Sequence, residues 1–332
     1  MVETLYKETH MKYILSFCLL LLSTQVQGAY LLKNGRLINT KYIATHSVED
    51  HFELGMKALK AHNWSAAEDQ FHIVITNFAD YSLANDAHYY LGVTLYEENE
   101  FDLANEHFSS YLLKSNTPTH LEDLYRYKLD IAMRLASGCR RRMFGSPSMP
   151  KIMNGSDLAV EIFDEIAAGL PNHELAGTAL IEKGKLLTRE EEYEQAIDTY
   201  HTTIRRFRGS RFALNAFHGI STCYFEELKK QPQNSDALVL AEINLRELKK
   251  EFPQAEELSL LEDEYRSMQE LYVDALYQTG QLYERMSQPK ASILYYHLAA
   301  TTLPSYHVAH LCKNRMKDLA QYVEELHLSI PA

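Results

Sequence analysis

Residues 52–71 read FELGMKALKAHNWSAAEDQF, and residues 89–108 read YYLGVTLYEENEFDLANEHF. Each stretch has a Leu-Gly pair, and the glycine is followed by an aromatic residue after 9 positions, an alanine after 12 and a second aromatic residue after 16. The two copies lie 37 residues apart. Self-similarity at a fixed spacing of this size indicates a repeat architecture. The residues that carry it are Gly55, Trp64, Ala67 and Phe71 in the first copy, and Gly92, Phe101, Ala104 and Phe108 in the second.

The pattern continues through the rest of the chain with gaps. Partial copies lie in residues 159–171, 241–253 and 280–304, and a full copy consists of Gly184, Tyr193, Ala196 and Tyr200. A glycine in a first helix lets a second helix approach closely. An alanine four residues before an aromatic residue puts a small and a large side chain on one face of that second helix. Each unit is therefore expected to be a helical hairpin, and the proline that ends each partial copy would close it.

Composition supports a helical fold. Glycine and proline number only 13 and 9 among 332 residues, too few to punctuate a many-stranded sandwich or barrel. Hydrophobic residues make up 46% of the chain, which excludes a disordered protein. A single hairpin cannot bury its own apolar face, so the hairpins must stack. We predict an all-α fold, an α-solenoid of about six stacked helical hairpins over residues 48–327.

This pattern resembles the tetratricopeptide repeat, whose signature includes a Leu-Gly pair, a small residue, an aromatic residue and a closing proline. Two hairpins are longer than the others. One contains GCRRRMFGSPSMPKIMN, residues 138–154, and the other has extra residues around KKQPQNSDA, residues 229–237. Both insertions are expected to be loops because of their Gly, Pro and polar residues. An unrelated helical bundle is the alternative. The repeats divide into a first pair, residues 48–118, and the remainder, residues 119–332, with the long loop near 138–155.

The first 28 residues are expected to be a secretory signal. Lys12 precedes an apolar run over residues 13–22, which is shorter than the roughly 20 residues that span a bilayer. Small residues lead to a cleavage site expected after Gly28. Acidic residues before Met11 are unusual in a leader, so translation is hypothesised to begin at Met11. A buried N-terminal helix is the alternative. Residues 29–47 are then an extended linker before the first repeat.

Cysteine use indicates neither a lipid anchor nor a disulfide framework. Cys18 lies within the apolar run behind Phe17, where a lipoprotein signal requires a small residue. Cys139, Cys223 and Cys312 are an odd number and form no CxxC motif.

Motifs for catalysis are missing from the sequence. No GxSxG, GxxxxGK[ST], GxGxxG or HExxH occurs in it. His307, His310 and Cys312 are the densest group of potential metal ligands, but no carboxylate or second cysteine stands nearby, so ordinary polar positions are expected. The glutamates at 190–192 are expected at a solvated turn, because acid–base catalysis needs opposed carboxylates in a cleft. We predict a protein that is not an enzyme, with no catalytic residues, no cofactor and no metal.

The charge balance argues against nucleic acid as a partner. Lys and Arg number 33 and Asp and Glu 45, a net charge of −12, whereas nucleic acid binding needs a surplus of cations. Two basic clusters interrupt this acidic background. Charged loops that keep the surface soluble are one interpretation, and a docking patch for an acidic protein or anionic lipid head groups is the other. The clusters are Arg140, Arg141 and Arg142, and Arg205, Arg206, Arg208 and Arg211.

A stacked array of hairpins leaves a face lined by the first helix of every hairpin, where a partner can bind. In the first two hairpins the positions expected on that face are Phe52, Met56, Leu59, Tyr89, Val93 and Tyr96. Core packing is the other interpretation of these residues. Phe52, Met56, Tyr89 and Tyr96 are the candidates for a client groove, since a tyrosine can stack on a peptide while its hydroxyl bonds the backbone.

Among exported repeat proteins, the chain resembles the BamD family, the scaffold of outer-membrane β-barrel assembly. The resemblance rests on residues 79–108 with Tyr81-Ser82 and Ala84 before a helix, on Phe144-Gly145 in the long insertion, and on a helix ending at Leu170-Pro171-Asn172. Two features differ. Ala29 stands where BamD proteins have a lipidated cysteine, and one more hairpin is expected than that family is usually counted to have.

This resemblance implies a periplasmic adaptor at the inner face of the outer membrane, peripherally associated with it. The N-terminal groove would receive unfolded outer-membrane proteins, and the C-terminal half would dock on the barrel-assembly machinery. One alternative is a CpoB-like periplasmic repeat protein that coordinates cell-wall or envelope processes, although residues 29–47 are too short for the coiled coil that would favour it. The others are a cytosolic secretion chaperone, if the leader is a helix, and an enzyme built on a helical-repeat scaffold.

Overall fold

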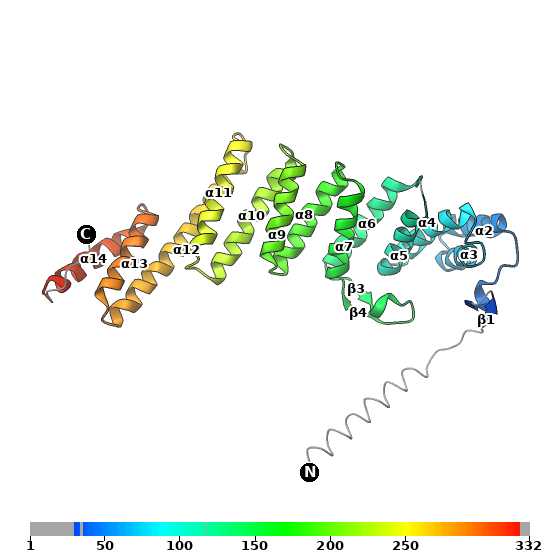
Figure 1. Ribbon diagram of the computed structural model, residues 1–332, viewed down its shortest axis with the longest axis horizontal. Helices are drawn as coiled ribbons and strands as arrows, with labels where there is room; N and C mark the ends of the chain where they lie inside the picture. The colour runs from blue at the N-terminus through cyan, green and yellow to red at the C-terminus, as the bar shows by residue number, and fades with distance from the viewer. Residues whose placement is uncertain (1–29, 34–35, 116, 326–332) are drawn as a thin grey trace, which may run out of the picture. The chain divides into compact units, whose positions relative to one another are not determined.

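The computed structural model describes residues 30–33, 36–115 and 117–325. These residues form thirteen α-helices, which confirms the prediction of an all-α fold, together with two short two-stranded sheets (Figure 1). The described helices pair along the chain as six hairpins followed by one more helix, in agreement with the repeat count.

The first helix of each hairpin is called an A helix and the second a B helix. The A helices are α2 (Val48–Lys60), α4 (Ser82–Glu97), α6 (Leu121–Ala136), α8 (Glu174–Arg189), α10 (Arg211–Lys230) and α12 (Leu258–Arg285). The B helices are α3 (Trp64–Asn77), α5 (Phe101–Lys114), α7 (Ser156–Gly169), α9 (Tyr193–Arg206), α11 (Ser235–Glu251) and α13 (Pro289–Thr302). Helix α14 (His307–Glu325) follows the last hairpin.

The chain divides into two compact units. Unit 1 contains the residues through Tyr127 together with residues 142–150, and unit 2 contains residues 128–141 and the chain from Lys151 onward. The division falls inside α6, whereas the repeats placed it after residue 118. Hairpins stack within each unit: α3 packs on α4 in unit 1, and α10 packs on α8 and α12 in unit 2.

The repeat signature corresponds to one recurring contact between the helices of a hairpin. A Cβ atom added to the glycine of the A helix would lie within 2.8 Å of the ring 16 positions later, at Gly55 against Phe71 and at Gly92 against Phe108. The same contact joins Gly184 to Tyr200, and Gly280 to Tyr296. Only a residue without a side chain allows the ring this close to the A helix.

The turn between the two helices also recurs. In the four hairpins with this glycine, the residue 7 positions after it has a left-handed backbone, and it is never glycine. Left-handed φ values are uncommon for other residues, so each turn is held by the packing of the helices that it joins. The residues are His62 (φ 55°), Asn99 (φ 60°), Glu191 (φ 67°) and Ser287 (φ 57°).

The segment before the first repeat is not simply an extended linker. Strands β1 (Tyr30–Lys33) and β2 (Arg36–Asn39) pair antiparallel, with Tyr30 opposite Asn39, and η1 (Thr40–Tyr42) follows. Ser47 then begins α2 with a capping box, in which its hydroxyl accepts the amide of Asp50 and the Asp50 carboxylate accepts the amide of Ser47. The expected signal at residues 1–28 lies outside the described residues.

The two insertions differ from the expected loops. In the first, β3 (Arg140–Arg142), η2 (Met143–Gly145) and β4 (Lys151–Asn154) form a hairpin that ends at Gly155 before α7. In the second, α10 continues to Lys230 because Leu228 packs in the core, so only residues 231–234 connect α10 to α11.

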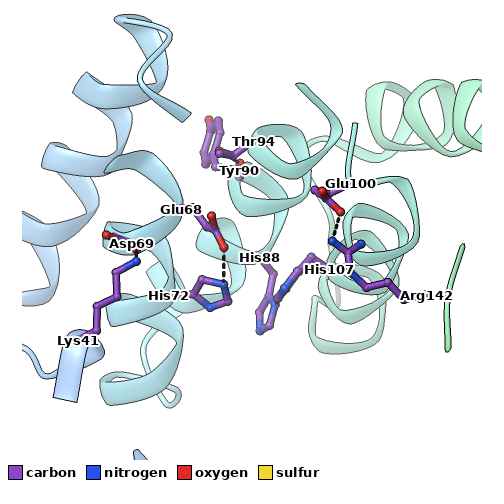
Figure 2. A network of polar contacts seen from close by, with 10 residues as sticks. All are labelled: Lys41, Glu68, Asp69, His72, His88, Tyr90, Thr94, Glu100, His107 and Arg142. Atoms are coloured by element: carbon purple, nitrogen blue, oxygen red, sulfur yellow. Dashed lines mark hydrogen bonds and ion pairs between the residues drawn. The ribbon is translucent and has the colours of Figure 1, made fainter. Parts of the chain in front are cut away.

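Arg142 ties the first insertion to α5 within unit 1. Its backbone N–H and its guanidinium donate to the two carboxylate oxygens of Asp102, each at 2.8 Å, and the guanidinium also pairs with Glu100 (Figure 2). The side chains of Arg142 and Asp102 are mostly buried, at 11% and 7% exposure. Arg142 therefore anchors residues 142–150 to α5. It has a structural role and is not part of an exposed basic surface.

Among the residues that the structure describes, none of the helices combines the length and the apolar composition that crossing a membrane requires.

Candidate functional site

The aromatic residues proposed for the client groove pack mainly on one another in unit 1. Phe52 contacts Phe71 and Tyr90 edge to face, with ring centroids 5.9 and 5.8 Å apart. Tyr96 is half-buried against Phe101 and Tyr127. Met56 is half-buried on α2. These rings stabilise the stacking of the first repeats, which is the alternative that the sequence left open.

Tyr89 lies in the core of unit 1. It is 6% exposed, its ring stacks on His120 at 4.3 Å, and it contacts Phe108 and Tyr111. Burial raises the pKa of its phenol far above the ordinary value. Counting from the Leu-Gly pair placed Tyr89 on the open face, but the structure turns its ring toward the B helix of its own hairpin. Its ring is not presented to a partner.

The four arginines of the proposed docking patch have different surroundings. Arg206 donates to the carbonyls of Ala167 and Pro171, at 2.7 and 2.6 Å, and so joins the end of α9 to the end of α7. Arg205 and Arg208 line a pocket of about 720 Å³ between α9 and α11 that also contains Lys250, Glu247 and Glu251. Arg211 is exposed at the start of α10. Arg206 therefore has a structural role, whereas Arg205, Arg208 and Arg211 are exposed.

The remaining sequence candidates are not brought together. Cys312 is buried, whereas His307 and His310 are exposed. In the described part of the chain, no group of three or more His, Cys, Asp or Glu side chains is arranged to hold a metal ion. The glutamates at 190–192 are exposed at the α8–α9 turn, where Glu191 pairs with Lys230. Arg141 donates to the carbonyl of Asn154 and so supports the β3–β4 hairpin.

A row of pockets follows the A helices of unit 2. The first, of about 580 Å³, lies between α8 and α10; the second, of about 810 Å³, lies between the α10–α11 connection and α12; the third, of about 580 Å³, lies between α12 and α14. Arg285 lines both the second and the third pocket. We call this row the A-face. It was not predicted, because the sequence directed attention to the first two hairpins.

The first pocket of the A-face has an apolar floor and polar walls. Ile181, Tyr200 and Gly219 form the floor. The side walls come from two helices, with Lys185, Thr188 and Arg189 on α8 and Asn215, His218, Thr222 and Glu226 on α10. Lys185 pairs with Glu182 at 2.8 Å, and Arg189 donates to the carbonyl of Ala136.

The pocket lining combines an amide side chain with charged groups of both signs. The amide of Asn215 has both donors and an acceptor, as a polypeptide backbone does. Lys185 and Arg189 bring positive charge to the α8 wall, and Glu191 and Glu226 bring negative charge to the same pocket. The pocket is open and lacks a buried pair of opposed titratable groups of the kind that acid–base catalysis uses.

The sequence does contain a signal for this pocket. Asn215, His218 and Thr222 follow one another at spacings of 3 and 4, a polar stripe on one face of α10 beside the buried stripe of Ala216, Phe217 and Ile220. A hairpin that needs only one face for stacking leaves such a stripe for a partner.

No protein-family model matches the chain, and no curated protein matches it. Solved structures of similar fold include a TPR repeats protein from Bacteroides fragilis, with a TM-score of 0.40 and 12% identity over 84% of this chain and 100% of that one. A tetratricopeptide repeat protein from Parabacteroides merdae has a TM-score of 0.34 and 12% identity over 82% and 98% of the two chains. MamA has a TM-score of 0.35 and 14% identity over 63% and 96%.

Proposed function

We propose that this chain is a non-enzymatic scaffold that binds an extended polypeptide segment along the A-face of unit 2. The observation that carries the proposal is the series of three pockets between α8 and α14, which a linear ligand could occupy together. Recognition of an extended chain needs backbone contacts for affinity and separate pockets for its side chains.

The first pocket defines which segment fits. Asn215 is placed to bond a backbone amide, and Lys185 and Arg189 favour a carboxylate, either an acidic side chain or the end of a chain. Tyr193 at the edge offers an aromatic surface for an apolar side chain. A peptide that ends in an aromatic residue and a free carboxylate has all three features.

The test is a pair of substitutions in the first pocket. Asn215 and Lys185 are both exposed, so Asn215→Ala with Lys185→Ala should leave the helical circular-dichroism spectrum unchanged. Truncating an interface hot spot typically costs about 2 kcal/mol or more, which is about thirtyfold in Kd. We expect at least that loss for C-terminal peptides of outer-membrane barrel proteins, measured by fluorescence anisotropy.

Two controls make this result specific. Lys313→Ala removes an exposed lysine from α14 and should bind like the parent. The same peptides with an amidated C-terminus should bind the parent more weakly than the free acid. If the double variant and the parent have the same Kd, the A-face is not the binding site.

The finer proposal is that the scaffold is exported and has a BamD-like role in outer-membrane barrel assembly, at the periplasmic face of that membrane. The apolar run at residues 13–22 and the BamD-like features support it. Two of those features lie at helix ends: Tyr81 precedes α4, and Leu170 follows the last residue of α7. The six hairpins support a chain long enough to contact a client and a folded partner at once.

Export and partner are tested together in a Gram-negative host. We expect a chain shortened by its leader in the periplasmic fraction, without palmitate labelling, and the barrel-forming component of the assembly machinery among the proteins that co-purify from envelope membranes. Cell-wall synthesis proteins in that fraction would favour the CpoB-like alternative. A full-length chain in the cytosol would contradict export and favour a secretion chaperone.

A further inference from the structure

Three imidazoles from three consecutive helices meet inside unit 1 (Figure 2). His72 lies on α3, His88 on α4 and His107 on α5. The Nδ1 atoms of His88 and His107 are 3.1 Å apart, and Nζ of Lys114 lies 2.8 Å from Nε2 of His88. The ring of His72 meets that of His107 edge to face at 5.7 Å. The sequence gives no sign of this group, because its members are 16 and 19 residues apart.

The hydrogen-bond partners assign one proton position each to His88 and His107. The ammonium of Lys114 can only donate, so Nε2 of His88 accepts and carries no proton. A neutral His88 then carries its proton on Nδ1 and donates it to Nδ1 of His107. His107 in turn has its proton on Nε2. We call this series Lys114, His88 and His107 the imidazole chain.

Every nitrogen within the imidazole chain already has a role, so an added proton must break a bond. A proton on Nε2 of His88 would face the N–H of Lys114, and a proton on Nδ1 of His107 would face the N–H of His88. Burial, and after it the charge of Lys114, lowers the pKa of His88 to about 4. Burial, followed by His72 and His88, lowers the pKa of His107 to about 3.

The surrounding charges do little to favour a protonated pair. On α3, Oε1 of Glu68 lies 3.6 Å from Nε2 of His72, and the carboxylate is directed to that ring (Figure 2). From η1, Lys41 pairs with Asp69 at 2.6 Å, and the ring of Tyr42 packs on His72 at 5.0 Å. Lys114 adds a positive charge from α5.

A second buried histidine in unit 1 also joins neighbouring segments through both ring nitrogens. His51 on α2 is 2% exposed, and its Nε2 accepts the backbone N–H groups of Thr45 and His46, both at 3.2 Å. Its Nδ1 lies 2.7 Å from the amide oxygen of Gln70 on α3 and donates to it.

We propose that unit 1 is an acid-sensitive element of the array, in which protonation of His88 or His107 breaks the imidazole chain and separates α3, α4 and α5 while unit 2 stays folded. The glycine–ring contact of these helices recurs in other hairpins and does not depend on pH. The histidines therefore make the packing of unit 1 dependent on pH. This inference does not depend on what the A-face binds.

The sign of the effect follows from linkage. A histidine in the unfolded chain has a pKa of about 6.5, above that of the buried imidazoles, so the unfolded state binds more protons at mildly acidic pH. The stability contributed by neutral His88 is complete above about pH 6.5 and falls as the pH drops toward 4. Because of His88 alone, the unfolding equilibrium constant of unit 1 should be about thirtyfold larger at pH 5 than at neutral pH.

Trp64 makes unit 1 observable by itself, because it is the one tryptophan in the sequence and it lies at the start of α3. We would unfold the full chain in urea between pH 7.5 and 4.5, following Trp64 fluorescence and circular dichroism. The fluorescence midpoint is expected to fall sharply below pH 6, while the part of the dichroism transition that belongs to unit 2 changes less.

Two variants assign that response to the imidazole chain. Lys114→Gln keeps a donor for His88 but removes the charge, and Lys114 is exposed, so the variant should fold and lose stability less steeply with acid. His107→Phe removes one titrating ring. The rise of the unfolding equilibrium constant of unit 1 with acid should therefore be smaller than in the parent, by a factor of about ten or more. The matched control is His62→Asn, because His62 touches the ring of Trp64 and asparagine tolerates its left-handed backbone.

The proposal requires that His62→Asn keeps the parent's pH dependence while the other two variants lose much of it. If all three variants respond to acid like the parent, or if unit 1 and unit 2 lose stability together, the imidazole chain is not the source of the acid response and the proposal is wrong.

Discussion

Gly184→Ala and Gly219→Ala are each expected to lower the free energy of unfolding of unit 2 by about 3 kcal/mol. Both glycines face the ring of Tyr200, from α8 on one side and α10 on the other. A Cβ atom would lie 2.4 Å from the ring at Gly184 and 2.3 Å from it at Gly219. Tyr200 is 2% exposed, so the ring cannot retreat from either new methyl group. Urea unfolding followed by circular dichroism measures the loss.

The double-mutant cycle with Tyr200→Leu tests this cause. If the ring is the obstacle, Gly219→Ala should cost much less in the Tyr200→Leu background than in the parent. Equal costs in both backgrounds would mean that contact with the ring does not account for the effect, and helix propensity would not account for it either, because alanine is a better helix former than glycine. Gly55→Ala is a comparison in unit 1, where the distance to Phe71 is 2.8 Å and the expected cost is smaller.

Ala67→Glu is expected to lower the free energy of unfolding of unit 1 by about 4 kcal/mol or to prevent folding. Ala67 has no exposed surface and lies on α3 four residues before Phe71, which is also fully buried. A glutamate there would place a charge without a partner in the close contact between α2 and α3. Urea unfolding followed by Trp64 fluorescence reports the change at the same helix.

Ser65→Glu is the matched control, because Ser65 is exposed two residues earlier in the first turn of α3. A negative charge near a helix N-terminus is favourable, so this variant should be as stable as the parent or slightly more stable. An Ala67→Glu protein within about 1 kcal/mol of the parent would contradict the close helix contact inferred from the repeat.

The sequence predicted the fold best where the contacts that define it join residues of the same hairpin. Gly92 and Phe108 belong to one hairpin, so their fixed spacing carries the contact between them, and the helical architecture follows from several such pairs. Spacing does not say which side of an A helix faces its own hairpin. That is why Tyr89 was assigned to an open face although it packs on Tyr111 and His120.

The misplaced and missed residues depend on contacts between distant parts of the chain. Arg206 bonds carbonyls 39 and 35 positions earlier, and Arg142 bonds Asp102 at a separation of 40, so a run of arginines could not be told from a free basic surface. The imidazole chain joins three helices through residues that look scattered in the sequence. The only sequence feature that indicates the A-face is the polar stripe of α10, and such a stripe matches no sequence motif.

The ring of Tyr200 has a consequence for how the array comes apart. Because it touches α8 of its own hairpin and α10 of the next, the two hairpins share one packing element. In a linear array, cooperativity is set by the strength of nearest-neighbour interfaces, and weak interfaces let terminal repeats fray independently. In an unfolding front that advances from α14, the loss of α10 would therefore also expose Tyr200 and weaken the α8–α9 hairpin. We therefore expect the fourth and fifth hairpins to lose their structure together once α10 is lost.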